Sequence, residues 1–156
     1  MSYGHTKKSS AIMVQYTKSS TQSLSDGDVI TFNTKKTTGS DGTSVNSSTG
    51  VIALDSSRRY WVQASISIEM SVNDSFEVTF QDSAGNNLDE DDGVFPAYHK
   101  LVTSGSVTPP FINHSYMASL VIDKPSLDYK LVASFDTSSS HTCTVETNLF
   151  IIEVGD

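Results

Sequence analysis

The sequence predicts an all-β protein, an antiparallel jelly-roll sandwich of about 8 to 10 strands with no significant helix. Three observations lead to this fold class. Apolar and polar residues alternate along most of the chain, which is the period of a strand with one buried face. Ser and Thr supply 27 and 16 of the 156 residues, whereas good helix formers are scarce. Clusters of Gly, Asn and Asp separate the alternating segments, as turns do between short strands.

The alternating segments are the expected strands. In chain order they are residues 12–16, 29–33, 51–54, 60–70, 76–80, 116–122, 131–135 and 144–154. The clearest is 60–70, in which the even-numbered residues are all apolar and most odd-numbered ones are polar. This pattern predicts a central strand with one continuous apolar face and with Trp61 on its other face.

Turn-forming clusters are expected at residues 25–28, 39–42, 46–50, 82–87 and 123–126. The weakly patterned stretch 89–110 is predicted to be a long surface connection. No repeat or linker divides the chain, so we expect a single domain at 11–156, preceded by a flexible polar arm at 1–10.

The charge balance and the cysteine count exclude several classes of protein. Lys and Arg total 10 against 18 Asp and Glu, which gives a net charge of -8. A phosphate backbone or an anionic membrane would repel such a chain, so neither nucleic acid nor membrane is an expected partner. The single cysteine, Cys143, excludes an intrachain disulfide and is expected to be a buried apolar filler. No signal peptide or membrane span is visible, so we expect a soluble protein made in a reducing cytoplasm.

Four segments carry a family resemblance: 29–33 (Val-Ile-Thr-Phe-Asn), 49–54 (Thr-Gly-Val-Ile-Ala-Leu), 60–66 (Tyr-Trp-Val-Gln-Ala-Ser-Ile) and the closing strand 148–154 (Asn-Leu-Phe-Ile-Ile-Glu-Val). Their order and spacing resemble the C1q/TNF-like jelly roll, particularly the form found in bacteriophage virion proteins. The resemblance covers the chain from about Gln15 to Val154. It implies a compact homotrimer in which apolar and aromatic side chains from one sheet of each subunit pack about a threefold axis.

No combination of residues points to catalysis, so we expect that the protein is not an enzyme. The four histidines, His5, His99, His114 and His141, lack the spacing of zinc ligands. No serine lies in a Gly-x-Ser-x-Gly motif. We therefore predict neither catalytic residues nor a cofactor.

Two charged motifs are candidate binding sites. The acidic run at 89–92 could offer Asp89, Asp91 and Asp92 to Ca²⁺, but its spacing is not that of an EF-hand and adjacent like charges repel. A solvated loop is therefore favoured over a metal site. Arg58 and Arg59, the only arginines, are interpreted as a strand end that faces water, with binding of a partner's carboxylate as the alternative.

Aromatic residues are the remaining candidates for an interface or a ligand. Trp61 could stack on a sugar, but a mid-strand aromatic is more often covered by a neighbouring subunit or loop. Phe95, Tyr98, Phe111 and Tyr116 flank the long connection and are the next candidates for contact with a partner.

A small, acidic, cysteine-poor jelly roll without catalytic residues is typical of a structural or binding module. We expect a virion protein, located on the outer surface of a capsid or fibre. The leading hypothesis is a homotrimeric capsid decoration or cement protein that bridges copies of the major capsid protein and stabilises the shell through many modest interfaces. The alternative is a receptor-binding tip domain of a head or tail fibre that recognises a host surface glycan.

Overall fold

The computed structural model describes residues 12–37, 42–70, 74–88, 94–95, 97–99 and 114–154. These residues form two antiparallel sheets without any helix, and this confirms the predicted all-β sandwich. Within the same residues no helix is long and apolar enough to cross a membrane. The predicted arm at 1–10 lies outside the described residues.

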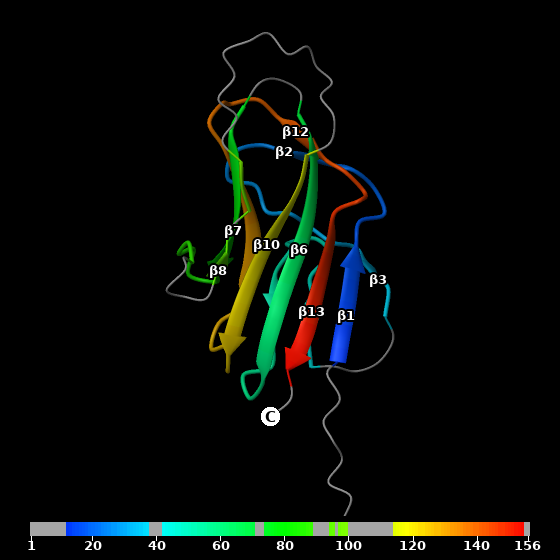
Figure 1. Cartoon of the computed structure of the whole chain (residues 1–156), viewed down its shortest axis with the longest axis vertical. Coiled ribbons are helices and arrows are strands. Elements are labelled where there is room, and N and C mark those ends of the chain that lie inside the picture. Colours follow the sequence, from blue (N-terminus) through cyan, green and yellow to red (C-terminus); the bar gives the residue numbers. More distant parts are fainter. Residues whose placement is uncertain are drawn as a thin grey trace, which may run out of the picture.

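The larger sheet is built around one long strand, β6 (Arg59–Glu69). One edge of β6 pairs with β10 (His114–Asp123), and the other pairs with β13 (Asn148–Val154) and then β12 (His141–Cys143). Four further strands complete this sheet of eight: β1 (Ile12–Thr17), β2 (Gln22–Leu24), β3 (Thr34–Lys35) and β8 (Val94–Phe95). Figure 1 shows β10, β6, β13 and β1 side by side, and the predicted central position of residues 60–70 is therefore confirmed.

The smaller sheet has five strands in the order β4, β5, β11, β7, β9. Their bounds are β4 (Ser44–Val45), β5 (Ile52–Ala53), β7 (Phe76–Asp82), β9 (Ala97–His99) and β11 (Tyr129–Phe135). Strands β8 and β9 lie within the stretch that the sequence predicted to be a long surface connection, so that prediction was incomplete. Both strands are only two or three residues long, which is too short for a recognisable alternating pattern.

The core lies between the two sheets and follows the predicted alternation. The even-numbered side chains of β6 and the Met70 that follows it are at most 1% exposed, whereas Trp61 on the opposite face is 44% exposed. From the smaller sheet, Phe80 of β7 and Leu131 of β11 meet them and are fully buried. Each such aliphatic or aromatic side chain contributes about 1.5–3 kcal/mol of burial free energy.

Two of the expected strands differ from the structure. Residues 29–33 were predicted to be a strand, but only Val29 forms an isolated bridge, to Val132 of β11. This segment runs alongside β11, where the Ile30 N–H donates to the Leu131 carbonyl, and then turns Ile30 and Phe32 into the core, so it leaves the sheet before a ladder forms.

The predicted strand 144–154 was wrong in its first four residues. Thr144 to Thr147 form a turn that separates β12 from β13 although both strands pair with β6. The Ser67 backbone remains paired across this interruption, because its N–H donates to Thr147 Oγ1 over 2.9 Å and its carbonyl accepts from the Thr144 N–H over 2.9 Å. A side chain thus replaces one backbone bond of the regular ladder.

Candidate functional site

The outer face of the larger sheet, the side turned away from the core, is the candidate functional site. Alternation along β1, β13, β6 and β10 directs every second side chain to this side, and the charged ones among them, Arg59, Asp123 and Glu69, lie toward the strand ends. Between them, the strand register aligns one side chain from each of the four strands in three successive rows, and none of these twelve side chains is charged. They are Met13, Gln15, Thr17, Asn148, Phe150, Ile152, Trp61, Gln63, Ser65, Met117, Ser119 and Val121.

One of the three rows is entirely apolar. Met13 lies opposite Ile152, which lies opposite Trp61, which lies opposite Val121. Three of these four side chains are well exposed: 54% for Met13, 44% for Trp61 and 56% for Val121. A row of exposed large apolar side chains across four strands is uncommon on a soluble monomer and is typical of an interaction site.

The other two rows are mixed but remain uncharged. Phe150 lies between Gln15 and Gln63, and Met117, 64% exposed, ends the third row. The Gln63 side-chain amide donates to Met117 Sδ over 2.9 Å, which links the neighbouring strands β6 and β10 on this face. The three rows therefore offer contact area and a few hydrogen-bonding groups but no ionisable side chain.

The side chains of the two arginines at the start of β6 point to opposite faces of the sheet. Arg59 points outward, next to Trp61, and its Nε lies 3.0 Å from Asp123 Oδ1 on β10. Arg58 turns to the core side, where its Nη1 donates to both carboxylate oxygens of Glu153 over 2.7 and 2.8 Å. Glu153 raises the pKa of Arg58, so this guanidinium stays charged. Each arginine thus already binds a carboxylate of its own chain.

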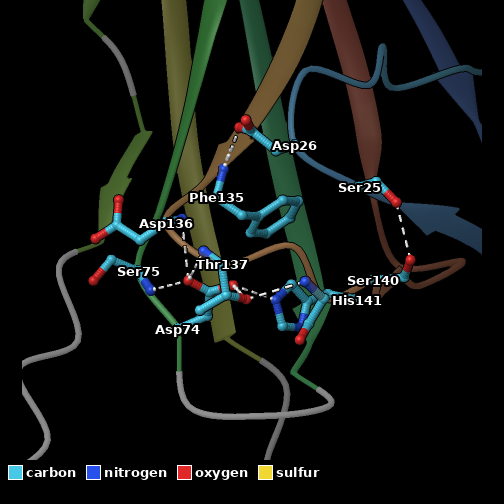
Figure 2. A network of polar contacts seen from close by, with 10 residues as sticks. Ser25, Asp26, Asp74, Ser75, Phe135, Asp136, Thr137, Ser140 and His141 are labelled. Atoms are coloured by element: carbon cyan, nitrogen blue, oxygen red, sulfur yellow. Dashed lines mark hydrogen bonds and ion pairs between the residues drawn. The ribbon is translucent and has the colours of Figure 1, made fainter.

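A buried polar network joins the two sheets at one end of the sandwich (Figure 2). Asp74, just before β7, accepts a bond from the His141 ring at the start of β12, with 2.8 Å between Oδ2 and Nε2. The same carboxylate accepts from the Thr137 hydroxyl over 2.6 Å and from the backbone N–H groups of Ser75, Asp136 and Thr137. Five donors therefore converge on one carboxylate.

This network is structural, because the Asp74 and His141 side chains are 0% exposed and no substrate can reach the imidazole. Burial by itself would raise the pKa of the Asp74 carboxyl, but the bonds from Thr137, His141 and the backbone outweigh burial and hold this pKa below its usual value. The sequence analysis missed the pair. The two residues are 67 positions apart, and neither lies in a recognisable motif.

Cys143 is fully buried in β12, as predicted. Burial raises the pKa of its thiol, so the sulfur stays protonated at neutral pH. Its Sγ lies 3.2 Å from Thr147 Oγ1, which is the hydroxyl that also bonds the Ser67 backbone. The residue is therefore part of the packing beneath the interruption between β12 and β13.

Several predicted candidates cannot be placed in a site. Asp89, Asp91, Asp92 and Phe111 lie outside the described residues. Phe95, Tyr98 and Tyr116 belong to β8, β9 and β10, for which only the backbone is described at these positions.

The described residues contain no other arrangement suited to a ligand. No group of three or more His, Cys, Asp or Glu among them is placed to hold a metal ion. A hollow of about 110 Å³ beside Tyr129 and Lys130 is small compared with the roughly 300 Å³ or more of typical ligand pockets.

Comparison with known proteins identifies the fold. No protein-family model matches the sequence, and no curated protein is similar to it in sequence. Among solved structures, the chain is similar to Eiger TNF from S. frugiperda, with a TM-score of 0.66 over 94% of each chain and 11% sequence identity. At this identity the likeness shows a TNF-like jelly roll, as the sequence predicted, and extends to the fold alone. It gives no support to a virion context.

Proposed function

We propose that the protein is a non-catalytic structural module that self-associates through the outer face of its larger sheet. One observation carries the proposal: on a chain with a net charge of -8, three successive rows of outward side chains across four neighbouring strands contain no charge. Copies of an acidic protein repel one another, so a face without charge is where two copies meet at the lowest electrostatic cost.

The apolar row supplies the attraction. Trp61 lies near its centre, with Ile152 on one side and Val121 on the other. Trp side chains that become fully desolvated at the centre of an interface commonly dominate its binding energy. The proposed assembly is a homotrimer, because TNF-like folds typically assemble in threes and a cyclic trimer buries one such face of every subunit.

We further propose that this trimer is a bacteriophage capsid decoration protein on the outer surface of the virion. The proposal is supported by the hydroxyl-rich acidic composition and by the lack of a catalytic arrangement among the described residues. The trimer would bridge major capsid protein subunits with its exposed loops, and many weak contacts would sum to a stable shell by multivalency.

A second candidate is a glycan-binding tip domain. It is favoured by the 44% exposure of Trp61 and by the Arg59 and Asp123 side chains that lie one row away. An exposed aromatic ring beside planar polar groups suits a sugar. The two candidates exclude each other at this face, because a Trp61 buried between subunits is not available for stacking.

The first experiment measures the solution mass by light scattering. The wild type should have the mass of three 16.9 kDa chains. Trp61→Ser should weaken assembly by about 30-fold or more, since central interface aromatics are worth about 2 kcal/mol or more, while the monomer still folds. Leu127→Ser is the matched control, because Leu127 is similarly exposed at 42% and lies in the turn after β10. A monomeric wild type would overturn the proposed self-association.

The second experiment tests whether the protein binds to capsids or to host cells. Purified protein is mixed with capsids that lack it and, separately, with host cells, and both are sedimented. Recovery with capsids is the expected result. Recovery with cells alone would replace the capsid proposal by the tip-domain candidate, and recovery with neither would overturn both.

A further inference from the structure

We propose that Arg59 and Asp123 set the register between subunits, with Arg59 of one copy pairing with Asp123 of the next. This inference rests on the proposed self-association through the outer face, and it names the residues that decide how two copies are aligned. The two side chains carry opposite charges directly beside the three uncharged rows of the outer face.

Strand register places this pair on the correct side of the sheet. Arg59 lies two residues before Trp61 on β6, and Asp123 lies two residues after Val121 on β10. They are directly opposite each other, in the row that follows the apolar row, and Val154 completes that row on β13. A partner seated on the apolar row would therefore also cover these two charges.

The pair is free to exchange partners because it is held weakly within the subunit. Its side chains are 54% and 57% exposed, and a single bond of 3.0 Å joins them. Exposed ion pairs of this kind add little to folding stability. Under a partner subunit the same charges lose water, and there an unpaired or like-charged neighbour becomes costly.

The symmetry of a ring makes this exchange possible at every interface. Each interface of a cyclic trimer brings one part of a subunit against a different part of its neighbour. A face that carries both Arg59 and Asp123 can therefore pair its Arg59 with Asp123 of one neighbouring copy and its Asp123 with Arg59 of the other. An alignment that places Arg59 against Asp123 of the next copy satisfies both charges, and the charges thereby select it.

The neighbouring ion pair provides an internal control. Arg58 and Glu153 lie on the core side of the same sheet, and Glu153 is only 14% exposed. Both carboxylate oxygens of Glu153 accept from Arg58 Nη1. Arg58→Gln should therefore lower the melting temperature without changing the assembly. Changes at Arg59 should instead weaken the assembly without lowering the stability of the subunit.

The deciding experiment uses charge reversal and mixing, with sedimentation equilibrium as the readout. Arg59→Asp and Asp123→Arg are each expected to weaken assembly at least about 10-fold, because every interface then joins like charges. Mixing the two variants should recover trimers, since two of the three interfaces of a mixed ring again join opposite charges. Within each of these subunits the two positions remain like-charged, so pairing inside one chain predicts no recovery.

Each result is informative. A wild type that stays monomeric would remove the proposed function on which this inference rests. A trimeric wild type whose two single variants assemble equally well would overturn the inference and leave the proposed function intact. Weakened single variants that do not recover on mixing would likewise overturn it, because the pair would then act only within its own subunit.

Discussion

Replacing Asp74 by Asn tests how the buried network holds the two sheets together. Asn has nearly the shape of Asp, and one oxygen can keep the three bonds from the backbone N–H groups of Ser75, Asp136 and Thr137. Its amide nitrogen then faces the Thr137 hydroxyl and the His141 ring, which donate to Asp74 Oδ2 in the wild type. The substitution therefore removes two charge-assisted hydrogen bonds at a fully buried position.

The expected loss is about 3 kcal/mol of unfolding free energy. Hydrogen bonds to a charged group contribute about 1.5–3 kcal/mol each, and the sum is reduced because the Thr137 hydroxyl can turn to accept a bond. For a chain of this length, that loss lowers the melting temperature by roughly 6–12 °C. Both proteins are compared at one concentration, because self-association also shifts the melting temperature.

The pH dependence gives an independent check. The pKa of the folded-state Asp74 lies below the ordinary 3.8, so its stabilisation is complete above that value and is lost as the pH falls through the lowered folded-state pKa. Asn does not titrate. The stability difference between wild type and variant should therefore shrink as the pH falls below about 4.

Asp136→Asn is the matched control. Asp136 is exposed and contributes only its backbone N–H to the network, so this variant should melt like the wild type. If Asp74→Asn melts within about 2 °C of the wild type, well short of the expected loss, or if its pH profile is the same, the carboxylate does not carry the stability assigned to it here.

Two further predictions concern the core and one turn. Val62→Asp, which buries an unpaired charge, should abolish soluble expression, whereas Gln63→Asp on the outer face should leave a folded chain; equal expression of both would contradict the assignment of the two faces. Gly50 has a φ of +71°, and a Cβ there would lie 2.7 Å from the Ile30 carbonyl oxygen. Gly50→Ala should cost about 2–4 kcal/mol in denaturant unfolding, against about 1–2 kcal/mol for Gly85→Ala, where φ is +86° but the space is open. An equal loss at both glycines would show that the contact with Ile30 carries no cost.

The sequence alone determined the class of fold and the two sides of its main strand. Alternation is a local property, since successive side chains of a strand point to opposite faces whatever the strand pairs with. Residues 60–70 therefore showed which side chains enter the core, and they showed that Trp61 does not. The same local reasoning failed at Thr144 to Thr147, where the β-rich composition continues but the ladder is interrupted by a bond from a side chain.

Only the tertiary structure decided which residues come together. The apolar row needs Met13, Ile152, Trp61 and Val121 in register across four strands, and the register depends on pairings between segments that are distant in the sequence. Likewise, adjacent Arg58 and Arg59 looked alike in the sequence, but the start of β6 directs them to opposite faces, where they meet different carboxylates. A period of two residues fixes the direction of a side chain, whereas its partners are fixed by the way in which the whole chain folds back on itself.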